Sequence, residues 1–350
     1  MNKTGFLLIS AILSLFSFRA GAQVASSGRE YSSEFRRAME YYNKEKYPAA
    51  IRLFDLYLSD PDNDDILSLT DARYYRALSS VKLFNPDAEY QVLTFIKMHP
   101  ESPRINEARL ALGNYFYQNK NYRKAVTHLE AVNRQELSPE ELPEYFFRLG
   151  YSHYMRGQKP RALLMFSEIK DTDNEYSVPA VYYYSQIAYE EEMYETALEG
   201  FNRLRHNETF GSIVHYYIVQ ILYLKKDYDQ ILEIAPGLAD KAGKDRANEL
   251  YRFIGDAYFN KQNYAEALPY LEKFAEGTKT AGREDKYQLG YCYYKAGDYD
   301  KAIKVLEEIG VRSDILSQNI WYVLGDCYLR LNNKDRAKFG FAEAAKLDFD

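Results

Sequence analysis

One acidic stretch of the chain has residue types and spacing that could bind a metal ion. Between Asp60 and Asp71, carboxylates partly follow the spacing of a calcium-binding loop, with ligand oxygens available from Asp60, Asp62, Asp64 and Asp71. Against calcium, Asp65 stands where such a loop needs glycine, and Asp71 replaces the bidentate glutamate. A turn between two helices explains the same residues, so we expect no metal and no cofactor.

The remaining candidates for catalysis do not form a constellation. The five histidines are spread along the chain without an i,i+4 pair, and no His-Glu-x-x-His motif is present. A Gly-x-Ser-x-Gly elbow, a phosphate-binding loop and a dinucleotide fingerprint are also absent from the sequence. We therefore expect a protein that is not an enzyme.

Tyrosine is the residue type whose abundance and spacing point to binding. The chain has 35 tyrosines, and many recur seven residues apart, as Tyr287 and Tyr294 do. Residues seven apart share one face of an α-helix. Because tyrosine offers a large contact area, few rotatable bonds and one hydroxyl, it is common at interfaces.

The elements that carry these tyrosines repeat along the chain. A small residue recurs with an aromatic three or four residues away and, in most copies, an alanine twelve residues later. The small residues are Ala38, Ala77, Gly113, Gly150, Ser185, Val219, Gly255, Gly290 and Gly325, at intervals of 34 to 39 residues. Such a narrow spread predicts nine stacked repeats.

Each repeat reads as two amphipathic helices joined by a tight turn. Glycine and alanine then have a packing role, because two helices cross closely only where one side chain is nearly absent. Cys292 and Cys327 occupy equivalent places in adjacent repeats. Equivalent helices lie about 8–10 Å apart, whereas a disulfide needs Cα atoms within about 7 Å, so we expect two buried thiols.

These repeats resemble the tetratricopeptide repeat. The fullest match is Trp321 to Tyr328, which contains Leu324-Gly325, followed by Ala337, Phe341 and Ala344. The resemblance covers residues 34–350 and implies an all-α fold, an α-solenoid of about nine helix-turn-helix repeats forming a right-handed superhelix. The second copy, 71–100, lacks the glycine and is slipped by one residue. The sixth has Val219 and Ile231 in the two small positions, which predicts helices further apart.

Longer joins divide the repeats. One of them, at residues 236–247, contains Pro236-Gly237 and Ala242-Gly243, which are turn and breaker residues. We expect a hinge there between two sub-arrays.

In tetratricopeptide arrays one face of the first helix lines a concave groove where partners usually bind. The resemblance therefore implies a groove lined by aromatic residues three before, one after and four after the small residue. These candidate partner-binding residues are Tyr42, Tyr74, Tyr117, Tyr151, Tyr154, Tyr182, Tyr189, Tyr216, Tyr223, Phe259, Tyr287, Tyr291, Tyr294 and Tyr322. Packing between neighbouring repeats is the alternative explanation for the same positions. The set of Lys, Asn and Arg residues by which some family members hold an acidic C-terminus has no match here.

The N-terminus predicts export. Lys3, an apolar run from Phe6 to Phe18 and Ala20-Gly21-Ala22 follow the order of a signal peptide, so we expect residues 1–22 to be removed and 23–33 to form a mobile leader. Removal takes away Lys3 and Arg19 and changes the formal net charge from −6 to −8. Such a charge disfavours nucleic acid. No later segment is apolar enough to span a membrane, so we expect a location in the periplasm or at the outer-membrane periphery of a Gram-negative bacterium.

The sequence thus predicts a non-enzymatic scaffold that binds a protein or peptide partner of unknown identity. Two alternatives stay open: a module that binds glycan or peptidoglycan strands, and the targeting arm of a larger protein that continues beyond residue 350. The last repeat has no additional polar helix to cover its apolar face, and solenoids need such a cap. We therefore also expect that the C-terminal repeat could associate end to end with another copy.

Overall fold

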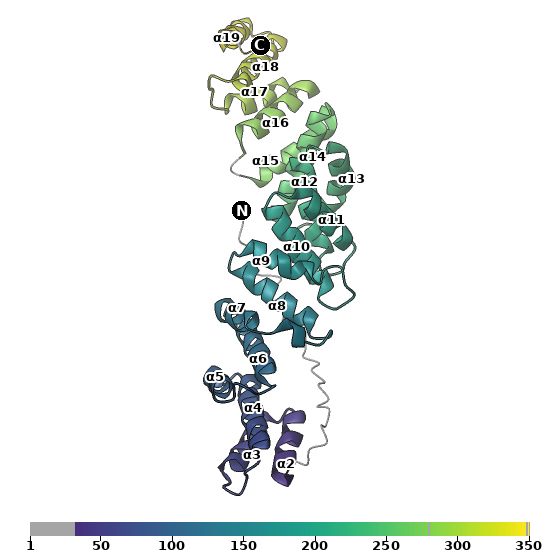
Figure 1. Ribbon diagram of the computed structural model, residues 1–350. Coiled ribbons are helices and arrows are strands. Elements are labelled where there is room, and N and C mark those ends of the chain that lie inside the picture. The colour runs from purple at the N-terminus through teal and green to yellow at the C-terminus, as the bar shows by residue number, and fades with distance from the viewer. Residues whose placement is uncertain (1–31, 279–280, 348, 350) are drawn as a thin grey trace. The chain divides into compact units, whose positions relative to one another are not determined.

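A computed structural model describes residues 32–278, 281–347 and 349, and within these ranges the chain is helical with no strand (Figure 1). It contains a short 3-10 helix, η3 (Arg134–Glu136), and eighteen α-helices. In chain order these are α2 (Ser33–Asn43), α3 (Tyr47–Ser59), α4 (Ile66–Lys82), α5 (Ala88–Met98), α6 (Ile105–Gln118), α7 (Tyr122–Glu130), α8 (Leu142–Met155), α9 (Lys159–Ser167), α10 (Ser177–Glu190), α11 (Tyr194–Leu204), α12 (Gly211–Leu224), α13 (Tyr228–Ala239), α14 (Lys244–Asn260), α15 (Tyr264–Gly277), α16 (Arg283–Ala296), α17 (Tyr299–Glu307), α18 (Ile315–Arg330) and α19 (Lys334–Leu347).

The helices pair as first and second helices of nine repeats, from α2 with α3 to α18 with α19, and the two helices of each pair pack against each other. The predicted all-α solenoid of helical repeats is therefore confirmed. The predicted signal peptide, 1–22, lies outside the described residues, as does the leader up to residue 31. No helix in the described part of the chain combines the length and apolar content needed to cross a membrane.

The chain divides into two compact units, which meet in sequence between Asn133 and Arg134. Unit 1 contains α2 to α7, and unit 2 contains α8 to α19. Residues 236–247, where we expect a hinge, lie within unit 2. Pro236 is inside α13, and α14 begins at Lys244. The hinge stays a prediction.

The turn inside every repeat has the same backbone geometry, which fixes the register of all nine copies. Seven residues after each small residue, one residue adopts a left-handed conformation: Glu45, Phe84, Lys120, Gly157, Glu192, Lys226, Gln262, Gly297 and Asn332, with φ between 55° and 80°. The N–H of this residue donates to the carbonyl three positions earlier, and the next N–H donates to the carbonyl five positions earlier. These two bonds are the Schellman arrangement, which satisfies the last carbonyls of the first helix.

The small residues allow the close helix crossings that the sequence predicts. A β-carbon built on Gly290 would lie 2.6 Å from Leu306 Cδ2, and one built on Gly113 would lie 2.6 Å from Leu129 Cδ2. Where the first helix carries Ser185 instead, the second helix carries Gly200, and a β-carbon there would lie 1.8 Å from the Ser185 Oγ. In this copy the close crossing therefore depends on a glycine of the second helix.

The two irregular copies depart from the pattern locally. In the second, Phe84 keeps the left-handed position, so the first helix is in register. The predicted one-residue slip begins after it, because α5 starts at Ala88, which is buried, with Asp87 as its N-cap. In the sixth, the fully buried Ala235 stands where most copies carry leucine or phenylalanine. The second helix is therefore small at the position where the first helix carries the larger Val219. Whether these helices lie further apart stays a prediction.

Candidate functional site

The candidate aromatic residues fall into three classes of exposure. Tyr74, Tyr151, Tyr154 and Tyr182 are buried. Tyr322 is 60% exposed. The others are half-buried: Tyr42, Tyr117, Tyr189, Tyr216, Tyr223, Phe259, Tyr287, Tyr291 and Tyr294. The buried four pack between helices, so ring contact with a partner is open mainly to the half-buried set and to Tyr322. In each unit, we call the surface formed by these positions on its first helices the first-helix face.

Tyrosine hydroxyls on the first helices connect five pairs of neighbouring repeats, one pair in unit 1 and four in unit 2. A tyrosine hydroxyl donates to a carboxylate or amide oxygen on the first helix of the following repeat, 31 to 36 residues later. These bonds join Tyr74 to Glu107 Oε2 (2.8 Å), Tyr154 to Glu190 Oε1 (2.9 Å), Tyr189 to Gln220 Oε1 (3.2 Å), Tyr294 to Asp326 Oδ2 (2.8 Å) and Tyr216 to Glu249. We call this series the hydroxyl ladder. It holds the rings in fixed orientations.

The ladder also changes the acidity of its tyrosines. Burial, followed by the hydrogen bond to Asp326, raises the pKa of Tyr294 to about 12. Outside the ladder, burial with the nearby Asp256 carboxylate also raises the pKa of Tyr223 to about 12. The pKa of Tyr154 rises for the same two reasons, burial first and Glu190 second. These hydroxyls therefore stay protonated and remain donors at neutral pH.

Arginines add further bonds between first helices of neighbouring repeats, one of them to an acceptor that a tyrosine also uses. In unit 1, Arg104 donates to Asp71 Oδ1 (3.4 Å) and Glu107 Oε1 (3.2 Å), with its guanidinium carbon 5.5 Å from the Tyr74 ring centroid. In unit 2, Arg252 Nε donates to Asp285 Oδ1 at 2.8 Å. The sequence analysis missed these residues. The sequence does contain a pattern that could have identified them: a polar residue recurs at the same position of several repeats, as Glu107 and Glu249 do.

A further set of tyrosines, also missed, opens the second helices. Tyr47, Tyr122, Tyr194, Tyr264 and Tyr299 each lie nine residues after the small residue, at the first position of a second helix. Each ring contacts the aromatic residue four after the small residue in its own repeat, with centroids 5.4 to 6.2 Å apart. Five of the half-buried rings thus pack against the first residue of the second helix in their own repeat.

A group of half-buried aromatic rings lies in unit 2 on α14, α15 and α16. Tyr291 is at its centre, with ring centroids of Tyr264 at 5.2 Å, Phe259 at 5.7 Å and Tyr287 at 5.7 Å. The Lys295 ammonium lies over this group, 5.2 Å from the Tyr291 centroid, 5.6 Å from that of Tyr294 and 5.7 Å from that of Tyr264. We call these residues, Phe259, Tyr264, Tyr287, Tyr291, Tyr294 and Lys295, the Lys295 cluster.

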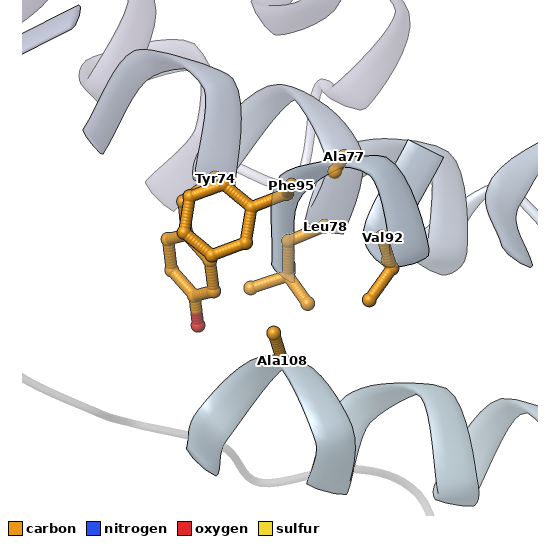
Figure 2. A pocket seen from close by; sticks show the side chains of 6 residues that line it. All are labelled: Tyr74, Ala77, Leu78, Val92, Phe95 and Ala108. Carbon is orange, nitrogen blue, oxygen red and sulfur yellow. The ribbon is translucent and has the colours of Figure 1, made fainter. Parts of the chain in front are cut away.

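An apolar pocket in unit 1 has no room for a ligand. Figure 2 shows its lining between α4, α5 and α6: Tyr74, Ala77, Leu78, Val92, Phe95 and Ala108. These side chains leave no space even for a water molecule. Tyr74 therefore serves to pack the helices here, and its hydroxyl reaches Glu107.

The residues that could have done other chemistry have structural partners. Asp65 caps α4 by accepting from the Ser68 N–H at 3.2 Å, and the largely buried Asp71 pairs with Arg104. His153 is buried, with Nδ1 2.8 Å from Gln158 Oε1. The expected pair of buried thiols is confirmed: Cys292 and Cys327 are free and buried, and burial raises the pKa of both to about 12. Such thiols are poor nucleophiles.

Comparison with known proteins gives two family matches. Residues 110–176 match the family model described as the tetratricopeptide repeat, and residues 260–341 match that of anaphase-promoting complex, cyclosome, subunit 3. A search of curated proteins finds no match.

Solved structures with similar folds include two repeat proteins from bacteria. One is a tetratricopeptide repeat protein from Parabacteroides merdae, at 18% identity over 70% of this chain and 94% of that chain, with a TM-score of 0.38. The other is the C-terminal part of a repeat-containing protein from Cytophaga hutchinsonii, at 16% identity over 73% of this chain and 99% of that chain, with a TM-score of 0.47.

Proposed function

We propose that this chain, which is a tetratricopeptide-repeat protein, acts as a non-enzymatic scaffold that holds a protein partner along its first-helix face. Tetratricopeptide repeats generally mediate protein–protein interactions. The observation that supports a binding role here is the set of half-buried aromatic rings, several of which are held in place by hydroxyl bonds or ring contacts of the same chain.

Pre-ordered rings favour binding for an energetic reason. A side chain that becomes immobilised at an interface costs about 0.5–1.5 kcal/mol in lost rotamer freedom. The hydroxyl ladder and the second-helix tyrosines have already restricted these rings in the folded chain. Most of that cost is therefore met on folding, and the exposed ring faces can contribute their apolar area to a partner.

The test compares two double variants in quantitative co-purification, followed by titration of the recovered partner. Replacing Tyr287 and Tyr294 together by alanine removes two adjacent rings of the first-helix face. We expect binding to weaken by about 2 kcal/mol or more, as for interface hot spots. The matched control removes rings elsewhere, at Tyr90, which is 73% exposed on α5, and Tyr270 on α15.

Equal partner affinity for the Tyr287/Tyr294 variant and the wild type, with unchanged circular dichroism, would contradict the proposal. Titration with soluble peptidoglycan fragments, followed by tyrosine fluorescence, tests the glycan alternative on the same variants. A saturable response to the glycan that is lost in the Tyr287/Tyr294 variant would favour that alternative over a protein partner.

We further propose that the scaffold works outside the cytoplasm, which rests on the sequence of residues 1–22. N-terminal sequencing of the protein purified from its native host tests this point. Cleavage after Ala22 leaves Gln23 as the first residue, whereas an intact Met1 in the purified protein would contradict export by this signal.

A further inference from the structure

The carboxylates of the first-helix face in unit 2 are already engaged by groups of the same chain. Glu190 accepts from Tyr154 and pairs with Lys159 (3.1 Å), and Glu249 accepts from Tyr216. Further along, Asp285 pairs with Arg252 (2.8 Å) and Asp326 accepts from Tyr294. These negative charges are therefore balanced or hydrogen-bonded before any partner arrives.

Lys295 is in a different situation. Its side chain is exposed, its ammonium lies within 6 Å of three ring centroids, and within the described ranges it has no carboxylate at ion-pair distance. Two acids of the same region are occupied: Asp298, three residues after Lys295, pairs with Lys301 (3.1 Å), and Asp326, which accepts from Tyr294, pairs with Arg330 (3.4 Å). Contact with ring faces positions the ammonium without neutralising its charge.

The cluster also contains one hydroxyl that no other described group of the chain engages. In the part of the chain that the structure describes, the Tyr287 hydroxyl makes no hydrogen bond. The centroid of the Tyr287 ring lies 5.7 Å from that of Tyr291. Burial raises the pKa of Tyr287 to about 12, so the hydroxyl is a donor at neutral pH. The Lys295 cluster thus offers one positive charge, at least one free donor and several apolar ring faces on one surface.

We propose that the Lys295 cluster binds a side-chain carboxylate of an extended protein segment, with the neighbouring apolar side chains of that segment on the rings of Tyr287 and Tyr291. This inference rests on the proposed scaffold function and specifies the chemistry of its partner. A carboxylate fits because a charge-assisted hydrogen bond to an ammonium is roughly twice as strong as a neutral one. The rings exclude water from one side of that bond and strengthen it.

The expected partner segment therefore combines aspartate or glutamate with apolar residues. An acid alone gains little, because the formal net charge of the whole chain is −6 and opposes the approach of anions. An apolar segment alone provides no carboxylate to pair with the Lys295 ammonium. The combination gives selectivity for segments that carry both features.

The experiment selects from a random ten-residue peptide library displayed on phage, using the full chain with wild-type sequence as bait. We expect the recovered peptides to share an acidic position next to apolar residues. The leading peptide is then synthesised with blocked ends, beside a copy in which its Asp and Glu residues are Asn and Gln. We expect the neutral copy to bind about 10-fold more weakly to the wild type.

Variants assign that preference to Lys295. In Lys295→Gln, the two peptides should bind within about 2-fold of each other, and Lys295→Arg should restore most of the difference. Lys301→Gln is the matched control, because Lys301 also lies over a tyrosine ring, at 5.1 Å from the Tyr293 centroid, but pairs with Asp298. It should leave the 10-fold preference unchanged.

Two failures can be told apart. If the selected peptides lack acids, or if Lys295→Gln keeps the full preference for the acidic peptide, the carboxylate inference is wrong while the scaffold function survives. If the selected peptides bind equally well to the Tyr287→Ala/Tyr294→Ala variant, then the first-helix face is not the binding surface and the proposed function fails with it. Thermal melts of each variant confirm that folding is intact.

Discussion

At the scale of single residues, tyrosine does two kinds of work in this protein. Tyr154 and Tyr182 are buried, and their positions in the repeat match those of half-buried tyrosines such as Tyr189 and Tyr216. The hydroxyl of a buried tyrosine needs a partner, because an unsatisfied polar group costs about 1–3 kcal/mol in the interior. For Tyr154, Glu190 of the next repeat supplies that partner, so this residue both stabilises the stack and has a fixed ring orientation.

Replacing Tyr154 by phenylalanine isolates the structural role. The variant keeps the ring but removes the 2.9 Å bond to Glu190, so we expect the free energy of unfolding to fall by about 1 kcal/mol. Urea denaturation followed by circular dichroism measures the change. Tyr90→Phe, at a position 73% exposed, serves as control and should change nothing. Equal stability of the two variants would show that the ladder bond contributes nothing net.

At the scale of helices and turns, the repeat is defined by close crossings and by one backbone conformation. Seven of the nine left-handed positions hold a residue other than glycine, although a β-carbon there costs roughly 1–2 kcal/mol. The Schellman bonds and the packing of both helices hold these residues in place. The turns are therefore a store of strain that glycine would relieve.

A reciprocal pair of substitutions tests this account in adjacent repeats. Gln262 (φ 61°) and Gly297 (φ 80°) occupy the same turn position. We expect Gln262→Gly to stabilise the chain by about 1 kcal/mol and Gly297→Gln to destabilise it by about the same amount. The double variant should return close to the stability of the wild type, because the effects of independent sites add. Urea midpoints measure all three, and a destabilised Gln262→Gly variant would contradict the role of the turn.

At the scale of the whole molecule, the shared feature is a large number of tyrosines with raised pKa values in both units. Burial is the main cause for each, including Tyr42 and Tyr74 in unit 1 and Tyr223, Tyr287 and Tyr294 in unit 2. In the unfolded chain these hydroxyls ionise near pH 10. Folding is thus linked to keeping them protonated.

This linkage predicts a loss of stability in alkali. Since the folded pKa of each group lies above its unfolded value, its contribution is complete below about pH 10 and declines as the pH rises toward 12. The urea midpoint should therefore be level between pH 7 and 9 and fall steeply from pH 10 upward. Absorbance at 295 nm should show tyrosine ionisation coinciding with unfolding. Ionisation near pH 10 of a chain that remains folded would contradict the raised values.

The sequence alone determined the repeat. A small residue at each helix crossing, a large apolar residue to fill the gap, and a turn of fixed length are local requirements, and they recur at intervals of 34 to 39 residues that can be read directly. The structure agrees with that register even in the second copy, where Phe84 keeps the left-handed position. Steric requirements of this kind act within a single repeat, so the sequence of each repeat is enough to show them.

Only the tertiary structure decided which tyrosines pack and which remain accessible. Tyr154 and Tyr189 are equivalent in sequence, yet one is buried and the other half-buried, because exposure depends on the side chains that the next repeat places against them. The position of Lys295 over three rings likewise depends on residues from α15 and α16 that the chain brings together. Contacts between residues 31 to 36 positions apart arise from stacking, and no pattern within one repeat specifies them.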